Sequence, residues 1–491
     1  MYVNPVIPGF YPDPSVCRLD DSFYLVASSF TYFPGVPIFR SADLVNWEQI
    51  GHVLDRTSQL DLSATEGWGS FGTFAPTLRH HDGRFFMITT VVDPTRMRNF
   101  FVTAADPSGP WSDPIEVDIR GIDPDIAWDD DGTCWVHFAG RGGINRVCID
   151  DRSGALLSTP EVTWSGTGMT SVEAPHLVRN GDYWYLLVAE GGTERGHAVS
   201  VARASTPLGP WEPCPANPIV SHRSTGKPIQ NTGHADLVEA LDGTWWMVLL
   251  GVRPRGQTPM FHVLGRETFL APVEWTDGWP RVADLELAMP YSPPGPEVVV
   301  DPIFRDNFDD AELGPCWVAF RRPAAEFASL TARYGSLTLD GDADGLAGVT
   351  PAYVARRQQH HEFRARARVS TGGAAEGGLA LLMDEHSWYS VGLVDGLVAA
   401  TARIGPLQQR IAEEPAPDGD IVVFVEARPA EGGGPDLVVL GYEIGEERRQ
   451  LAELDGRFLS TEVCTGFVGR TIGMYAVGGR ASFDWFDYRP I

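Results

Sequence analysis

The chain has 491 residues, of which 43% are hydrophobic and 21% charged, and its formal net charge is −27. This length exceeds a single small module, and the composition is too apolar for a disordered chain. Such a negative charge repels phosphate backbones and anionic lipids. Nucleic acid and membrane surfaces are therefore not expected partners, and an uncharged ligand is favoured.

The N-terminal stretch MYVNPVIPGFYPDPS lacks the basic and apolar regions of a secretory signal, and no apolar run approaches the length of a membrane span. We therefore expect a cytoplasmic protein. The six cysteines include no C-x-x-C pair, which is typical of reduced thiols rather than of a disulfide framework or a zinc site. The sequence leaves homo-oligomerisation open.

Five segments share one pattern, in which a polar or glycine turn is followed by an aromatic pair and alternating apolar residues. The second aromatics are Tyr24, Phe86, Trp135, Trp184 and Trp246, at intervals of 62, 49, 49 and 62 residues. Each segment is typical of a β-hairpin, and the spacing matches one four-stranded propeller blade. The first region is therefore predicted to be a five-bladed β-propeller.

The strand before each hairpin is expected to be the innermost strand of its blade, which lines the central funnel. Matched positions on these strands read YPDPSV, FAPTL, IDPDIAW, VEAPHL and GHADLV. Three of the five carry a carboxylate: Asp13, Asp123 and Glu173. These side chains should meet near the propeller axis although they are remote in sequence.

Carboxyl groups crowded into a partly buried funnel disfavour the ionised form, so one should hold a proton near neutral pH. A protonated acid facing an ionised carboxylate is the equipment of glycoside hydrolysis. Taken singly, each residue also has a simpler interpretation. Asp-Pro dipeptides such as those at Asp13 and Asp123 commonly initiate turns, and Glu173 could be a solvated edge charge. The joint placement favours a catalytic site.

Several long motifs resemble glycoside hydrolase family 43, closest to its β-xylosidase and α-L-arabinofuranosidase branch. They are VIPGFYPDPSV, SSFTYFPGVPIFRSADLVNWEQIGHVL, GIDPDIAWDDDG, EAPHL, NTGHADLVE and LGRETFLAPVEW, and they span residues 3 to 285 in order. FRDNFDDAELGPCWVAFRRP, RRQQHHEFRARARV and ASFDWFDY are similar to the β-sandwich that follows the propeller in that branch. The resemblance implies an all-β chain, a five-bladed β-propeller followed by a concanavalin-like β-sandwich.

The resemblance also implies residue roles. Asp13 would be the general base that activates water, Glu173 the general acid, and Asp123 the carboxylate that orients the acid and raises its pKa. His234 would hold a channel water or a calcium ion, although a hydrogen-bonded core histidine is an equal alternative. No cofactor is expected to be required, and a structural calcium is the one ion considered.

Three further residues are candidates for contact with the sugar. Phe30 matches an aromatic that borders the bound sugar in the family, although an aromatic in a β protein is usually core. Phe74 and Ala174 stand where the family usually has Trp and Gly, which affects the fit of the sugar rather than the reaction. Arg266, in LGRET, either touches substrate or packs between blades.

Two other motifs are set aside. Asp129–Asp131 resembles a calcium loop but lies at a hairpin turn, so a solvated turn is favoured. GGTERG, from Gly191, lacks the lysine and the strand-to-helix context of a phosphate loop.

Two domains are predicted: a catalytic propeller over residues 1–288 and a β-sandwich over residues 304–491. The stretch 289–303, with the proline-rich segment MPYSPPGPEVVVDP, would join them as a linker. The sandwich is either a carbohydrate-binding module or, as the resemblance favours, a wall that packs near the active-site funnel. A wall would leave a short pocket that admits only a chain end.

The predicted function is an inverting, exo-acting glycosidase that releases terminal β-1,4-linked xylose from xylooligosaccharides and also acts on terminal α-L-arabinofuranose. Arabinose-substituted oligosaccharides are therefore candidate substrates as well. Two alternatives remain: an enzyme that is mainly an α-L-arabinofuranosidase, and a non-catalytic sugar-binding propeller.

Overall fold

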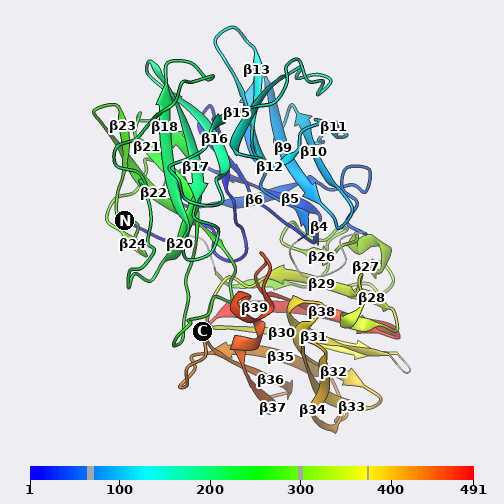
Figure 1. The fold of residues 1–491 in the computed structure, drawn as a ribbon. Helices are drawn as coiled ribbons and strands as arrows, with labels where there is room; N and C mark the ends of the chain where they lie inside the picture. Colours follow the sequence, from blue (N-terminus) through cyan, green and yellow to red (C-terminus); the bar gives the residue numbers. More distant parts are fainter. Residues whose placement is uncertain (64–70, 297–301, 373–374) are drawn as a thin grey trace.

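The computed structural model describes residues 1–63, 71–296, 302–372 and 375–491. Nearly all regular structure in these residues is β-strand, and the single α-helix, α1 (Thr461–Cys464), is one turn long. Figure 1 shows a propeller coloured blue to green packed against a sandwich coloured yellow-green to red. None of the described segments forms a helix long and apolar enough to cross a bilayer. All six cysteines are free thiols.

The propeller has five antiparallel sheets, one for each predicted hairpin. The first contains β2 (Ser15–Leu19), β3 (Ser22–Val26), β5 (Gly35–Ser41) and β6 (Glu48–Leu54). The second contains β7 (Gly72–Thr73), β8 (Thr77–His81), β9 (Arg84–Val92), β10 (Met97–Ala104) and β11 (Ile115–Glu116). The third contains β12 (Gly121–Trp128), β13 (Cys134–Gly140), β14 (Gly143–Ile149) and β15 (Glu161–Trp164).

The fourth sheet contains β16 (Glu173–Asn180), β17 (Tyr183–Glu190), β18 (Ala198–Ala204) and β19 (Glu212–Pro213). The fifth contains β20 (Gln230–Glu239), β21 (Trp245–Val252), β22 (Glu267–Thr276) and β23 (Trp279–Val282). The inner strands contact one another in the order β2, β8, β12, β16, β20 and back to β2. The fold is thus a closed five-bladed propeller. The two ends of the propeller segment are joined where β1 (Tyr2–Val3) pairs with β24 (Ala288–Met289).

The aromatic pair of each hairpin explains how the blades pack. Successive side chains of a strand point to opposite faces, so the two members of a pair enter different interfaces. Phe85 packs between the first and second blades, whereas Phe86 packs between the second and third. Trp184 and Tyr185 divide in the same way between the two neighbours of the fourth blade. The repeat seen in the sequence is therefore the signature of these inter-blade cores.

The C-terminal domain is a sandwich of two sheets. One contains β25 (Phe304–Asp306), β27 (Ala328–Ser329), β28 (Leu337–Gly341), β30 (Phe363–Thr371), β35 (Ile421–Arg428), β36 (Leu437–Ile444), β37 (Glu447–Asp455) and β39 (Gly479–Pro490). The other contains β26 (Val318–Phe320), β29 (Ala352–Arg357), β31 (Glu376–Asp384), β32 (Ser387–Val394), β33 (Leu397–Ile404), β34 (Leu407–Pro415) and β38 (Thr471–Val477).

The two domains share a sheet and a core. A propeller strand, β4 (Tyr32–Phe33), pairs with β26 and forms the edge of the second sandwich sheet. Phe10, Phe30 and Tyr32 are buried in the main core of the sandwich. Residues 297–301 of the predicted linker lie outside the described residues. The shared sheet and core place the sandwich directly against one end of the propeller.

Candidate active site

The three predicted carboxylates lie together at one end of the inner strands. Asp13 precedes β2, Asp123 lies in β12 and Glu173 begins β16. All three line one cavity of about 240 Å³, together with His234 of β20. The three carboxylates that the alignment of the blades selected therefore lie in one cavity, as expected from the sequence.

Local backbone geometry turns these side chains into the cavity. Asp13, Asp123 and His234 have positive φ angles of 58°, 54° and 46°, and Ala174, which follows Glu173, has a φ of 54°. The ladders of β12, β16 and β20 shift register at the same points. Such bulges re-aim side chains, and non-glycine residues in this region are strained. Strained backbone positions therefore occur at or next to the residues that carry the side chains of the cavity.

Asp13 is held as a carboxylate. Burial opposes its ionisation, but Arg266, His234 and a hydrogen bond from Ser28 together keep its pKa below the usual value. Arg266 Nη1 donates to Asp13 Oδ1 at 2.8 Å, and Ser28 Oγ donates to Asp13 Oδ2 at 2.5 Å. Both carboxylate oxygens thus accept charge-assisted or short hydrogen bonds, which favour the ionised form.

In contrast to Asp13, Asp123 and Glu173 have raised pKa values, which favour their protonated forms. Burial and the negative charge of Asp13 raise the pKa of Glu173 to about 7. Burial, Glu173 and Asp13 raise the pKa of Asp123 well above its usual range. The backbone N–H of Ala174 donates to Asp123 Oδ2 at 3.2 Å. Because that donor favours a charge on Asp123, the proton that the pair retains is better placed on Glu173.

Arg266, whose role the sequence left open, faces the cavity. Besides Asp13 it reaches Thr193 Oγ1 at 3.1 Å, and its guanidinium lies over the rings of Phe30 and Phe467, 5.6 and 5.4 Å from their centroids. It is only 8% exposed. Arg266 therefore lines the site, where its guanidinium contacts both the Asp13 carboxylate and the aromatic wall of the cavity.

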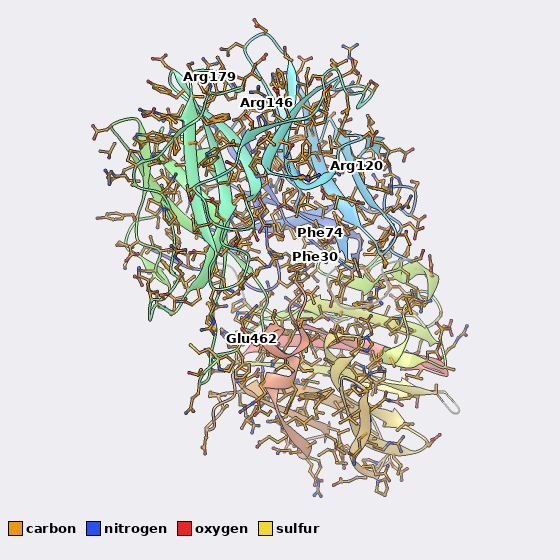
Figure 2. The ribbon with its side chains drawn as sticks, in the orientation of Figure 1. Phe30, Phe74, Arg120, Arg146, Arg179 and Glu462 are labelled. Carbon is orange, nitrogen blue, oxygen red and sulfur yellow. The ribbon has the colours of Figure 1, made fainter. Side chains whose placement is uncertain are left out.

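Phe30 and Phe74 form that wall on the propeller side. Their rings pack with centroids 5.3 Å apart, and both contact Phe467. Figure 2 labels Phe30 and Phe74 at the rim of the propeller that faces the sandwich. Phe30 is thus buried in the core and also borders the cavity, where contact with the sugar remains a prediction.

His234 is buried beside Asp13, with its Nδ1 3.4 Å from Asp13 Oδ1. Burial lowers its pKa to about 3, so the ring is neutral at working pH. Its second neighbour is the ring of His176, at 5.8 Å between centroids. The neutral imidazole can orient Asp13 or a water without adding charge.

Below the cavity the propeller axis is occupied by a guanidinium. Arg79 donates to Asp236 at 2.7 Å, to Asp125 at 2.9 Å and to Ser15 at 3.2 Å. Both aspartates are fully buried. Calcium prefers six to eight oxygen ligands, whereas the axial carboxylates here are already bound to Arg79. Within the described ranges no group of three His, Cys, Asp or Glu side chains is placed to hold a metal. This donor set fits the calcium expected near His234 poorly.

Several lining residues were not predicted as site residues. Phe467 comes from the sandwich loop after α1, nearly 200 residues after the last propeller motif, which ends at Trp275. Thr193 and Glu194 belong to GGTERG, which the sequence analysis set aside as a phosphate loop. A second cavity of about 520 Å³ adjoins the site and shares Thr193, Glu194, Arg266 and Phe467 with it. The site thus continues toward the sandwich.

Buried carboxyl groups held in opposite protonation states, in an aromatic-walled cavity, define the site of a glycoside hydrolase. Comparison with known proteins agrees. The model described as glycosyl hydrolases family 43 matches residues 2–280, and that of the "Beta xylosidase C-terminal Concanavalin A-like domain" matches residues 305–489. The chain belongs to glycosyl hydrolases family 43.

Relatives of the whole chain are glycosidases of two specificities. The chain is 37% identical to the "Non-reducing end alpha-L-arabinofuranosidase BoGH43B" of Bacteroides ovatus, over 99% of this chain and 94% of the relative. It is 38% identical to a xylosidase/arabinosidase of Butyrivibrio fibrisolvens, over 99% and 98%. The crystal structure of a xylan β-1,4-xylosidase from Bacillus halodurans matches with a TM-score of 0.90 and 30% identity, over 100% of both chains.

Proposed function

We propose that this enzyme is an inverting exo-glycosidase that releases terminal β-1,4-linked xylose from xylooligosaccharides. The observation that carries the proposal is the contrast between Asp13, held ionised by Arg266, and Glu173, whose pKa is raised to about 7 in the same cavity. That contrast supplies one base and one acid to a single glycosidic bond.

The chemistry balances in one displacement. Asp13 accepts a proton from a water molecule as the water oxygen attacks the anomeric carbon. Glu173 gives its proton to the glycosidic oxygen as the carbon–oxygen bond breaks. Asp13 is poorly suited to attack the carbon itself, because Arg266 and Ser28 already hold both of its oxygens. Asp123 accepts the Ala174 N–H, which favours its ionised form and so leaves the retained proton on Glu173.

The shape of the site supports attack at a chain end. The catalytic cavity is small, and Phe467 of the sandwich closes it against Phe30 and Phe74. The adjoining cavity at Thr193 and Glu194 provides room for the rest of the chain as leaving group. The sandwich thus acts as a wall of the site in this proposal, rather than as a separate sugar-binding module.

The second candidate is an enzyme that acts mainly on α-L-arabinofuranosides. It is favoured by the arabinofuranosidase among the relatives. Comparing kcat/KM on 4-nitrophenyl β-D-xyloside and 4-nitrophenyl α-L-arabinofuranoside separates the two. We expect the xyloside to be the better substrate, and the reverse order would support the second candidate.

The roles are tested by changing the leaving group. Asp13→Asn should lower kcat about a thousandfold or more on every xyloside, because water attack is always required. Glu173→Gln should be as severe on xylobiose but mild on dinitrophenyl xyloside, whose leaving group needs no proton. Asp131→Asn, in an exposed hairpin turn, is the matched control. Equal losses for Glu173→Gln on both substrates would refute its role as the acid, and xylobiose binding without any turnover by the unaltered chain would favour a non-catalytic propeller.

A further inference from the structure

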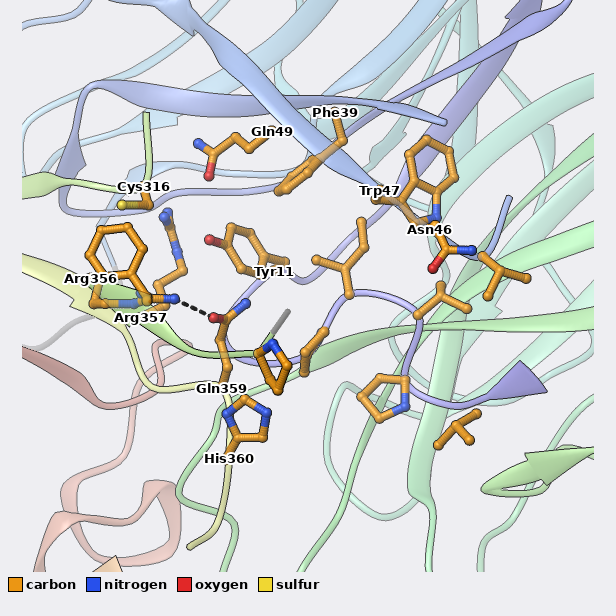
Figure 3. Close-up of a pocket in the computed structure, with 18 of the residues that line it drawn as sticks. Tyr11, Phe39, Asn46, Trp47, Gln49, Cys316, Arg356, Arg357, Gln359 and His360 are labelled. Atoms are coloured by element: carbon orange, nitrogen blue, oxygen red, sulfur yellow. Dashed lines mark hydrogen bonds between the residues drawn. The ribbon is translucent and has the colours of Figure 1, made fainter. Parts of the chain in front are cut away.

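A third cavity, also of about 520 Å³ but distinct from the one that adjoins the catalytic site, lies where the first residues of the propeller meet the sandwich. Tyr11, Phe39 and Trp47 line it from the propeller, and Arg356 and Arg357 line it from β29 of the sandwich (Figure 3). None of its described lining residues also lines the catalytic cavity. It is thus a separate site in space.

The wall of this cavity has the opposite charge to the protein as a whole. Arg356 and Arg357 line it, and none of its described lining residues is Asp or Glu. His360 also lines the cavity but is neutral, because burial lowers its pKa to about 4. The chain carries a formal charge of −27, so a cavity with two arginines and no carboxylate among its described lining residues is unusual for it. Its field favours an anionic ligand.

Arg357 is the decisive residue. It is 1% exposed, yet its Nε, Nη1 and Nη2 have no hydrogen-bond partner in the part of the chain that the structure describes. Arg470, buried to the same degree, is paired with Asp436 at 2.6 and 3.0 Å and also donates to two carbonyls. Leaving a buried charge unpaired is costly. Among the described residues, the guanidinium of Arg357 therefore has no acceptor like the Asp436 carboxylate that pairs with Arg470.

Aromatic rings account for only part of the surroundings of Arg357. Its guanidinium lies over the rings of Tyr11, Phe10 and Tyr32, with distances of 4.5, 5.4 and 5.9 Å to their centroids. Rings attract a cation through their faces but accept no bidentate in-plane hydrogen bonds. A carboxylate that approaches the edge of the guanidinium would supply those acceptors.

Arg356 extends the cationic end of the cavity. Its Nη2 donates to Gln359 Oε1 at 2.5 Å, while Nε and Nη1 are unpartnered among the described residues. Figure 3 shows Arg356, Arg357 and Gln359 at one end of the cavity and Trp47 with Asn46 toward the other. At the rim, Val3 and Ile303 are 69% and 60% exposed, so the cavity opens to solvent.

We propose that this cavity binds a sugar acid of the uronate class, with its carboxylate on Arg357 and its ring against the partly exposed ring of Trp47. Aromatic faces suit the C–H face of a pyranose, and the amides of Asn46, Gln49 and Gln359 suit its hydroxyl groups. The ligand would contact both domains. Binding would therefore stabilise the domain interface and raise Tm.

The test measures Tm and calorimetric binding of glucuronate to the full chain. Glucose is the neutral control and inorganic phosphate the control for a general oxyanion. We expect glucuronate to raise Tm and bind at least tenfold more tightly than glucose. Arg357→Met should remove that preference, while Arg480→Met, which alters an exposed ion pair of the same domain, should not. An equal response in Arg357→Met, or no glucuronate binding at millimolar concentration, would overturn the proposal.

Two further measurements keep the proposal testable if Arg357→Met does not fold. Trp47→Ala, at a partly exposed position, should weaken glucuronate binding while leaving phosphate binding unchanged. A phosphate response equal to that of glucuronate would replace the sugar acid by a general anion site. Glucuronate should also bind without competing with 4-nitrophenyl xyloside, and competitive inhibition would place it in the catalytic cavity instead.

Discussion

The raised pKa of Glu173 predicts a specific pH dependence of the reaction. In the free enzyme kcat/KM requires Glu173 protonated and Asp13 ionised. With the Glu173 pKa at about 7, the protonated fraction falls to about one tenth at pH 8 and one hundredth at pH 9. The profile should therefore fall with unit slope above pH 7. The acid limb should lie below the usual aspartate range, since Arg266 lowers the Asp13 pKa.

The neighbouring carboxylate Glu194 offers a way to move the basic limb of the profile. Glu194 lines the cavity, and its charge helps to raise the pKa of Glu173, after burial and the charge of Asp13. Glu194→Gln should shift the basic limb to lower pH and leave the acid limb nearly in place. Asp131→Asn, at an exposed position of a hairpin turn, should move neither limb.

The assay is kcat/KM for an aryl xyloside from pH 3 to 10, read at a wavelength where leaving-group absorbance does not depend on pH. Stability of each variant across the range is checked by recovery of activity on return to pH 6. A profile that stays flat from pH 6 to 9 would refute the assignment of Glu173 as the acid. If Glu194→Gln leaves the basic limb at the same pH, the electrostatic explanation of the raised Glu173 pKa is refuted.

Three other perturbations test the strain, the axis and the wall of the site. Ala174→Gly should raise the free energy of unfolding by about 0.5–1 kcal/mol in urea titration, since relief of left-handed strain outweighs the extra backbone entropy of glycine; a destabilised variant would contradict this. Arg79→Met should lower it by about 3–5 kcal/mol by leaving two buried carboxylates unpaired, while dialysis against EDTA should leave Tm and kcat unchanged; activity lost to EDTA and restored by calcium would reverse this account of the axis. Phe467→Ala should raise KM for xylobiose about tenfold, whereas Phe458→Ala, a part-exposed control, should not; an unchanged KM would remove the sandwich from the site.

Local patterns predicted the propeller because each blade repeats them. The aromatic pair after each turn fills two inter-blade cores, so a period in sequence reports a period in space. Asp13, Asp123 and Glu173 could be found because each lies at or close to the start of the inner strand of its blade. The bulges at these points were not predicted, since register shifts depend on the partner strand.

Other features depend on contacts that no repeat encodes. Phe467 enters the site from the other domain, and β4 joins a sandwich sheet through pairing with β26, nearly 300 residues away. One local pattern in the sequence pointed to the buried charge of Arg79 on the axis. Asp125 and Asp236 each lie two residues after a site residue on an inner strand, where a second layer of polar side chains can form. Their shared partner, Arg79, is visible only once the ring is closed.

The role of Asp13 is tested most directly by the configuration of the first product. Proton NMR of freshly released xylose from a β-xyloside should show the α-anomer first, followed by slow mutarotation, because water activated by Asp13 attacks from the opposite face. Initial release of β-xylose would mean a covalent intermediate, and would contradict the account of Asp13 as a base held by Arg266.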